Sequence, residues 1–412
     1  MAVTLEAERP SQLGQVPIQT EITTTEKNTS FSWDVPLPLH AWPSSETRIV
    51  DIRSSDACPL DNLDASIIDG LTRPRGHKVL PSLLVWDQKG QTLYSDVLAA
   101  DEYYPYRVEH ELLQERVDEM ASTIALCRTD LLVELGAGNM SKTAQLLSHL
   151  DKYLRAPVMY YALDVDQAQL ERSLVQLNAR TKLRWITPCG LLGTYDDGAK
   201  WLARPEMAAF RRTLVWMGSS IANCEQHEAS QLLESFSQDP DTGTRQNLAG
   251  FLLLVDGCQD AGRINLAYDI PSGETRRWML HALESARHQL HGKGDDDDAE
   301  IDRLLADENW RFEGRWHPEQ QRYENYLVPT RDLIGVIQGQ QICLEQGERI
   351  RLLGSGKWAE NTVASVVSKP GLEVRKAWHH VEFNYGAYWL QPTIRRHDSG
   401  VDMMMSEAPL KG

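Results

Sequence analysis

The chain has few cysteines, no long apolar run and no excess of basic residues, and each of these shortages argues against a class of protein. The six cysteines in 412 residues are scattered without a Cys-x-x-Cys pair, so no metal site is expected and the thiols are typical of a reduced, cytoplasmic enzyme. No apolar stretch reaches transmembrane length, and no basic and then apolar segment follows Met1, so neither a membrane nor a secretory route is expected. The formal net charge of −17 argues against a nucleic-acid binder, because phosphate neutralisation needs patches of Lys and Arg. A small-molecule substrate is therefore favoured, and the composition indicates no particular oligomeric state.

The most informative segment, residues 131–147, reads LLVELGAGNMSKTAQLL. Its apolar start predicts a buried parallel strand, and Gly136 and Gly138 allow a sharp turn from which no side chain protrudes. The leucines that follow have helical spacing. After a second apolar run, residues 158–163, Asp164 stands where a carboxylate can accept hydrogen bonds from a ribose. The pattern predicts a nucleoside-binding βαβ unit.

Two classes of cofactor use such a unit, and the residues after the turn favour one of them. Dinucleotide enzymes need a third glycine near the helix start, where this chain has Met140 and Ser141. S-adenosylmethionine needs no phosphate cradle. Its ammonium and carboxylate need an acidic or carbonyl-rich turn and a cation, which Glu134, the backbone of Gly136, Ala137 and Gly138, and Lys142 could supply. A methyltransferase is therefore favoured over an oxidoreductase. A strand-to-helix turn that binds no ligand remains the structural alternative.

The pattern beyond this unit predicts a parallel α/β sheet. Residues 1–47 are predicted to form a polar tail, residues 49–53 a strand, and residues 60–71 and 109–124 helices, while WDQKG after residue 85 predicts a turn. Strands alternating with helices are expected near Val133, Ala162, Trp185 and Leu214 and at residues 251–255.

The last third of the chain has a different pattern. Residues 292–298, which are rich in Gly and Asp, predict a solvated loop. Residues 310–336 and 345–358 alternate in polarity, which predicts antiparallel strands with turns at QGQ and EQGE.

Polar loops are expected after two of the parallel strands, at residues 193–198 and 216–223. The Asn223 amide can donate and accept, which suits a substrate with a carboxylate and an amine, although Asn223 could equally cap a helix at residues 225–236. Tyr103 and Tyr268 offer phenols that can bind a carboxylate or orient an amine, and core or interface positions are the alternative for both.

Seven motifs together resemble one enzyme family: WDQKG, DEYYPYRVEHELL, LLVELGAGNMSKT, YYALDVDQAQLERSL, GLLGTYDDGAKWL, GSSIANCEQHEA and LLLVDGCQD with INLAYD. Over roughly residues 50–385 the chain is similar to the histidine-betaine methyltransferases of ergothioneine biosynthesis in their fungal form. That family includes fungal N-methyltransferases acting on 4-dimethylallyltryptophan in ergot alkaloid pathways. The resemblance implies amine N-methylation by S-adenosylmethionine.

The resemblance also implies an architecture and a set of site residues. A Rossmann-like methyltransferase domain is expected at residues 108–258 and 358–400, with an inserted α+β substrate domain at residues 48–107 and 259–357. In the cofactor pocket, Gly136 and Gly138 would lie near the methionine moiety, Lys142 on its carboxylate, Asp164 on the ribose and Tyr195 near the adenine. Asn223 and Tyr268 would bind the substrate α-carboxylate, with Tyr103 closing the pocket.

Two positions depart from the family's histidine-specific members. Trp86 stands where these have a tyrosine. Their motif I-x-x-E-x-S-x-K-aromatic reads IRLLGSGKW here, so Leu353 replaces a glutamate that would hold an imidazole, while Ser355 is retained at the substrate. Losing that carboxylate removes a charge-assisted hydrogen bond of roughly 1.5–3 kcal/mol. Leucine and tryptophan instead form an apolar slot that suits an indole or a prenylated indole.

The predicted activity is therefore N-methylation of the α-amine of an aromatic amino acid, tryptophan or a prenylated tryptophan, in fungal secondary metabolism. Histidine N-trimethylation, a scaffold with weak activity, and a local misalignment around Gly354 are the alternatives. Methyl transfer to an amine mainly requires proximity and an unprotonated nitrogen. Tyr103 or Tyr268 is the candidate to guide that proton.

Overall fold

The computed structural model describes residues 48–53, 62–238, 247–292 and 298–393. The predicted tail at residues 1–47, Cys58 and most of the acidic run at residues 293–297 lie outside these ranges. None of the helices in the described ranges is long and apolar enough to cross a membrane.

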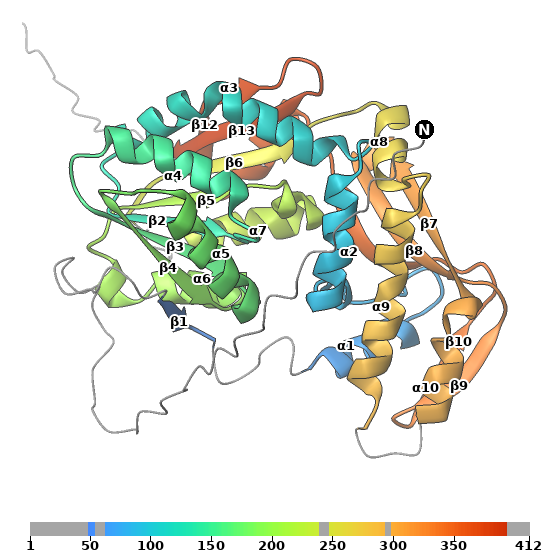
Figure 1. Cartoon of the computed structure of the whole chain (residues 1–412). Helices are drawn as coiled ribbons and strands as arrows, with labels where there is room; N and C mark the ends of the chain where they lie inside the picture. The colour runs from blue at the N-terminus through green and yellow to red at the C-terminus, as the bar shows by residue number, and fades with distance from the viewer. Residues whose placement is uncertain (1–47, 54–61, 239–246, 293–297, 394–412) are drawn as a thin grey trace, which may run out of the picture. The chain divides into compact units, whose positions relative to one another are not determined.

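The largest element of the fold is a mixed sheet in the order β1-β4-β3-β2-β5-β6-β13-β12 (Figure 1). The strands β1 to β6 are parallel to one another, and the C-terminal pair adds two strands at one edge, of which β13 is antiparallel to β6 and β12 is antiparallel to β13. The α/β expectation is confirmed. Its strands are β1 (Ile49–Asp51), β2 (Leu131–Leu135), β3 (Val158–Asp164), β4 (Ile186–Leu192), β5 (Arg212–Trp216), β6 (Leu248–Asp256), β12 (Leu372–His379) and β13 (Tyr385–Pro392).

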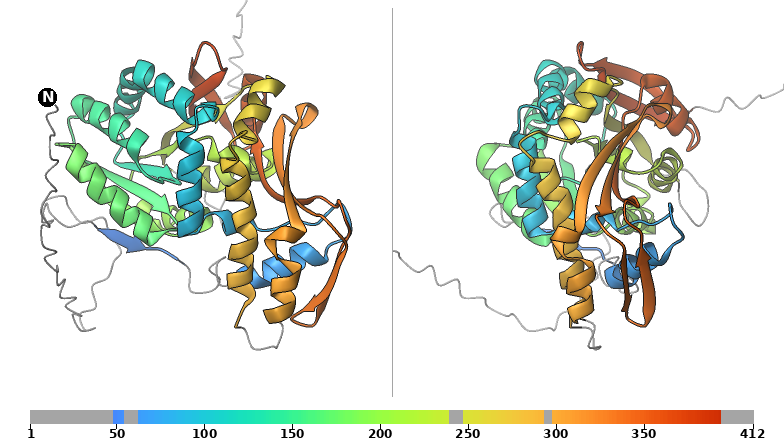
Figure 2. Two further views of the ribbon diagram at one scale, coloured as in Figure 1. Left: turned by 45° about the vertical axis from the view of Figure 1, so that its right-hand side comes forward. Right: turned by 90° about the vertical axis from the view of Figure 1, so that its right-hand side faces the viewer.

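Helices cover both faces of this sheet, which explains why its central strands are continuous apolar runs. One face packs against α3 (Tyr104–Leu126), α4 (Ser141–Tyr153) and α5 (Gln167–Arg180), whose leucines meet Leu132 and Ala162 (Figures 1 and 2). The other face packs against α6 (Tyr195–Leu202), α7 (Gln226–Ser237) and α11 (Glu360–Ser368). The chain order reverses at β2, which has β3 on one side and β5 on the other. A ligand is expected at the carboxyl end of such a switch point.

A second, antiparallel sheet follows in the chain. It pairs β11 (Ile350–Gly356), β8 (Arg322–Pro329) and β7 (Trp310–His317), and β9 (Leu333–Ile337) and β10 (Gln340–Leu344) form a hairpin beside it. The positive φ angles of Gly339 and Gly347, +72° and +77°, place the expected QGQ and EQGE turns. This sheet shares a core with α1 (Leu63–Thr72), α2 (Gln88–Ala99), α9 (Glu274–Leu290) and α10 (Asp298–Leu304), while α8 (Ala261–Tyr268) packs into the core of the large sheet (Figure 2).

Three local expectations are wrong in detail. WDQKG is not a turn but the start of α2, because the Asp87 side chain accepts a hydrogen bond from the backbone N–H of Gly90 (2.7 Å) and caps the helix. Residues 193–198 are not a loop, because Thr194 and Asp197 form a capping box that opens α6. The strand expected to be centred near Trp185 runs instead from Ile186 to Leu192 and is centred at Cys189.

One short strand differs from the expected domain division. Ile49–Asp51 pairs in parallel with β4, so these residues belong to the large sheet and not to the second-domain segment at residues 48–107. Backbone hydrogen bonds fix this register at both ends of the strand: the N–H of Gly190 donates to the carbonyl oxygen of Arg48, and the N–H of Ile52 donates to that of Leu192. The rest of the two-domain division stays a prediction.

Candidate active site

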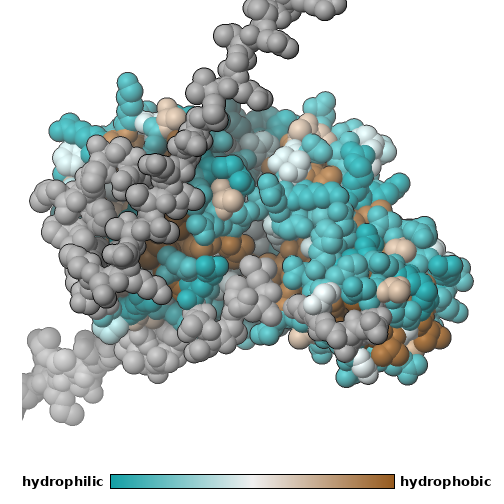
Figure 3. Space-filling view, turned by 60° about the horizontal axis from the view of Figure 1, so that its bottom comes forward, coloured by the Kyte–Doolittle hydropathy of each residue, from teal (hydrophilic) through white to brown (hydrophobic). Residues whose placement is uncertain are grey.

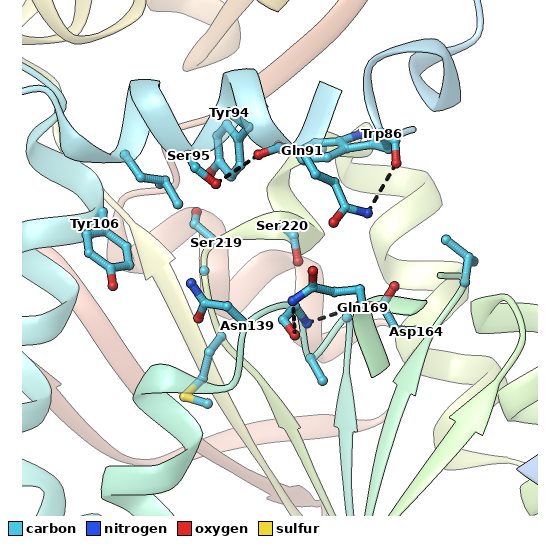
Figure 4. Close-up of a pocket in the computed structure, with 18 of the residues that line it drawn as sticks. Trp86, Gln91, Tyr94, Ser95, Tyr106, Asn139, Asp164, Gln169, Ser219 and Ser220 are labelled. Atoms are coloured by element: carbon cyan, nitrogen blue, oxygen red, sulfur yellow. Dashed lines mark hydrogen bonds between the residues drawn. The ribbon is translucent and has the colours of Figure 1, made fainter. Parts of the chain in front are cut away.

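A cavity of about 880 Å³ opens at the carboxyl ends of β2, β3 and β5. Figure 4 shows Trp86, just before α2, and Gln91 and Tyr94 of α2 facing Asn139, Gln169 and Asp164 across this space. All of the residues that the sequence nominated line it: Trp86, Tyr103, Glu134, Gly136, Ala137, Gly138, Lys142, Asp164, Tyr195, Asn223, Tyr268, Leu353 and Ser355. A volume in the range of 300–1,000 Å³ is typical of small-molecule sites.

The glycine turn after β2 leaves open space where a cofactor can lie. Gly136 and Gly138 have φ of +70° and +53°, a region that favours glycine. A Cβ on Gly136 would come 2.8 Å from the Tyr195 hydroxyl, whereas no atom of the described residues lies within 4 Å of a Cβ on Gly138. The missing side chain of Gly136 therefore leaves room for the Tyr195 hydroxyl, and that of Gly138 leaves the backbone exposed to the cavity.

Asp164 lies at the end of β3, and each of its carboxylate oxygens already accepts one hydrogen bond. Oδ2 accepts a hydrogen bond from the backbone N–H of Gly138 (3.0 Å) and Oδ1 from that of Asp166 (3.2 Å). Each carboxylate oxygen can accept a second bond, so the side chain can still receive two ribose hydroxyls. Burial raises the pKa of Asp164, and the backbone bonds oppose that shift. The turn and this carboxylate fit an adenosine moiety.

Glu134 is enclosed by protein groups. Tyr160 donates a short hydrogen bond to it, and the Thr143 hydroxyl lies 2.8 and 2.9 Å from its two oxygens. Burial raises the pKa of Glu134 to about 7 despite these bonds. The carboxyl group therefore changes charge near neutral pH.

Lys142 lies in the cavity wall but already has an anionic partner. Its Nζ forms an ion pair with Glu109, whose other oxygen accepts a hydrogen bond from the backbone N–H of Gly218 (2.6 Å). The role of Lys142 on the cofactor carboxylate stays a prediction, and the lysine could take it only while it also pairs with Glu109. Sequence reasoning missed Glu109, although a charged residue among the buried positions Val108, Leu112 and Leu113 of one helix was a signal.

A buried lysine fixes two hydroxyl groups that line the cavity, those of Tyr268 and Ser355. Lys357 Nζ is fully buried and reaches Tyr268 Oη (2.7 Å), Ser355 Oγ (3.0 Å) and Asp256 Oδ2 (3.0 Å). Because an ammonium can only donate, both hydroxyl oxygens accept from it. The two hydroxyls lie 3.1 Å apart, so one can donate to the other and at least one proton remains for a ligand. The motif quoted above contains Lys357, but the sequence did not show what it contacts.

Aromatic rings form the rest of the substrate-side wall. The Trp86 ring centroid lies 5.1 Å from those of Tyr94 and Trp278, in edge-to-face geometry, and the Tyr103 and Tyr268 rings are 5.6 Å apart. Leu353 lines the same space. Among the described residues, the acidic side chains lining the cavity are Glu134 and Asp164, and both belong to the parallel strands β2 and β3. The aromatic end of the cavity is therefore without a carboxylate in the part of the chain that the structure describes.

The fold and this site define a class of protein: a Rossmann-like enzyme that binds a nucleoside cofactor at its switch point without a phosphate cradle and leaves room for a second small molecule. The family model of the histidine-specific, S-adenosylmethionine-dependent methyltransferases matches residues 63–392. The chain is 36% identical over 341 residues to the N-methyltransferase imqF of Aspergillus flavus, covering 82% of this chain and 87% of that protein. The chain belongs to this family.

Two further relatives differ in their named roles. The chain is 30% identical to ergothioneine biosynthesis protein 1 of Neurospora crassa, covering 84% of this chain and 37% of that protein. It is 26% identical to the 4-dimethylallyltryptophan N-methyltransferase easF of Claviceps purpurea, covering 83% of this chain and 98% of that protein. The predictions of an N-methyltransferase and of S-adenosylmethionine as its cofactor are confirmed by the family match.

Proposed function

We propose that the enzyme methylates the α-amine of an aromatic amino acid and prefers an indole side chain to the imidazole of histidine. The observation that carries this proposal is the aromatic end of the cavity, where Leu353 and Trp86 stand and the described chain places no carboxylate. An imidazole placed there would bury a second ring nitrogen that an indole lacks, and a buried polar atom left without a partner costs roughly 1–3 kcal/mol. An indole ring buries a large apolar area against the same wall.

S-adenosylmethionine, bound at the glycine turn and Asp164, supplies the electrophilic methyl group. The chain's own residues position the amine. The proton that Lys357 leaves free on Tyr268 or Ser355, together with the Asn223 amide, can bind the substrate carboxylate and so direct the amine toward the glycine turn. Holding two reactants in line can lower a barrier by several kcal/mol.

The tyrosines serve this site as neutral phenols. Burial raises the pKa of Tyr103 and Tyr268 well above the usual range, so neither is a phenolate at neutral pH. Each can donate a hydrogen bond and pass a proton along, in line with the role of guiding the amine proton that the sequence suggested. The apolar wall assists by disfavouring the ammonium form of the substrate.

Comparing kcat/KM for histidine, tryptophan and 4-dimethylallyltryptophan by mass spectrometry tests the proposal. The wild type is expected to favour an indole substrate, and Leu353→Glu is expected to shift the ratio toward histidine by restoring the acceptor. Leu353→Gln is the matched control, because it has similar size without the charge. A wild type that favours histidine would overturn the indole assignment and leave the methyltransferase assignment standing.

Histidine remains the second candidate substrate because the family model is histidine-specific and ergothioneine biosynthesis protein 1 is a relative.

We also propose the cytoplasmic location that the scattered cysteines suggest. It rests on sequence composition.

A further inference from the structure

Two buried polar atoms in the wall of the cavity have no hydrogen-bond partner among the residues that the structure describes. These are Thr275 Oγ1, in the first turn of α9, and Asn325 Oδ1, in the middle of β8. Both residues line the cavity, and each is only 2% exposed. A buried polar atom that stays unpaired is costly, so an arrangement of this kind is expected to find a hydrogen-bond partner on a ligand: the amide oxygen needs a donor, and the threonine hydroxyl can accept one as well.

The orientation of the Asn325 amide is set by its neighbour. Asn325 is opposite Leu353 in the β8–β11 register, and its Nδ2 donates to the Leu353 carbonyl oxygen at 2.9 Å. The reverse orientation would set two acceptors against each other. Asn325 therefore offers an oxygen, and not its amino group, to whatever lies beside it.

The surroundings of these acceptors restrict the ligand group to a neutral one. Leu353, Trp86 and Trp278 line the same end of the cavity, and the indole N–H of Trp278 is already used by Val85 O at 3.0 Å. A cationic group would need a carboxylate, and the carboxylates that line the described cavity stand at the parallel strands. A flat apolar ring that carries one neutral N–H matches an apolar wall with an amide oxygen and a hydroxyl in it.

The structure assigns Asn325 and Thr275 as a recognition site for a ring N–H on the side chain of the substrate. The assignment rests on the proposed function and deepens it: the enzyme would select an indole-type ring for its hydrogen-bond donor as well as for its apolar faces. Asn325 then supplies a neutral acceptor next to the position where Leu353 has replaced a charged one.

The test compares two substrates that differ only in the donor: tryptophan, and the analogue with a benzothiophene ring, in which sulfur replaces the N–H. In the wild type, kcat/KM is expected to be about 5- to 150-fold higher for tryptophan. In Asn325→Leu and in Thr275→Val this ratio is expected to fall toward one, because the donor no longer meets its acceptor. Ser95→Ala is the matched control, since Ser95 lines the cavity but its hydroxyl is bonded to Gln91 O within α2.

Each outcome bears on the inference. A ratio near one in the wild type overturns it, as does an undiminished ratio in both variants. Calorimetry with S-adenosylhomocysteine shows whether each variant is folded. If a variant is not folded, the kcat/KM ratio of the two substrates in the wild type tests the inference by itself. An enzyme that methylates histidine and accepts neither ring would overturn the proposed function together with this inference, whereas turnover of both rings at equal rates overturns the inference alone.

Discussion

Single residues in this site show how buried charge is balanced. Lys357 and Asp256 are both fully buried, and Tyr104 also donates to Asp256 at 2.7 Å. Lys142 and Glu109 form a second ion pair beside the cofactor turn, in which the lysine side chain is 16% exposed and the glutamate is buried. Removing water from an ion is costly unless partners replace it. Both lysines have such partners, and so they act on a ligand mainly through the groups that they orient.

At the residue scale, the first prediction concerns the anchor for the substrate carboxylate. Asn223→Ala and Tyr268→Phe are each expected to raise the substrate KM by about 10- to 150-fold, because each removes a hydrogen bond to a charged group. The affinity for S-adenosylhomocysteine, measured by calorimetry, is expected to stay within about twofold. Tyr153→Phe, at the end of α4, is the control for loss of a hydroxyl. An unchanged KM in both variants would show that the carboxylate binds elsewhere.

A second prediction at this scale concerns Glu134 and pH. Its pKa rises from 4.5 to about 7 on folding because the carboxyl is buried. The stability linked to its proton is fully present below pH 4.5 and is lost as the pH rises through 7, since the unfolded chain ionises first. Wild type is therefore expected to lose roughly 1–3 kcal/mol of unfolding free energy relative to Glu134→Gln between pH 5 and 8. Urea titrations of both proteins without cofactor measure this difference, and parallel pH curves would contradict the expectation.

At the scale of elements, a strand of the small sheet holds the turn that carries Asn223. Arg322 of β8 donates to the carbonyl oxygens of Ala222 (3.1 Å), Asn223 (2.6 Å) and Cys224 (2.8 Å), which end the 3₁₀ turn Ser220–Asn223. Its guanidinium crosses β11 at Gly354, where a Cβ would lie 2.0 Å from Nη2. This glycine leaves room for the guanidinium of Arg322, whose hydrogen bonds join the antiparallel sheet to a turn after β5.

Gly354→Ala and Arg322→Lys are therefore expected to act on substrate binding through Asn223. Both variants should raise the KM for the amino acid about 10-fold or more while changing the cofactor affinity little, because a small misplacement of a binding group is costly. Arg315→Lys, at an exposed position of the neighbouring strand, is the control. Steady-state kinetics separates the effects, and a fall in kcat with no change in KM would argue against a positioning role.

At the scale of the whole molecule, the cavity joins the two sheets around one site. The Gln91 amide of α2 donates to Asp166, which caps α5 two residues after β3 ends (2.7 Å), so α2 is bonded to the loop that follows a parallel strand. In Figure 3, hydrophilic residues cover most of the coloured surface, and hydrophobic residues gather near its centre and at the lower right. A ligand that contacts both sides is expected to stabilise the folded chain.

The cofactor prediction follows at this scale. S-adenosylhomocysteine at about 100 times its Kd is expected to raise the unfolding free energy by about 2.7 kcal/mol, because it binds the folded state alone. NAD at equal concentration should give no such shift, since the turn lacks a phosphate cradle. Asp164→Ala should reduce the stabilisation by S-adenosylhomocysteine. Thermal unfolding with each ligand measures these shifts, and stabilisation by NAD alone would contradict the site assignment.

The sequence by itself determined the parts of this protein that depend on neighbours in the chain. The run from Leu131 to the helix after Gly138 contains its own strand, turn and helix periodicity, so the cofactor unit could be predicted. The substitution at Leu353 was visible for the same reason, because it stands within one short motif.

Only the tertiary structure decided which distant residues meet. Three contacts join segments that are far apart in the chain. They are the ion pair of Lys142 with Glu109, the hydrogen bonds from Arg322 to the turn that carries Asn223, and the pairing of Ile49–Asp51 with β4. The orphaned oxygen of Asn325 is of the same kind, since whether a buried polar atom lacks a partner depends on every element packed around it. Periodicity reports which side of an element is buried, but not what it is buried against.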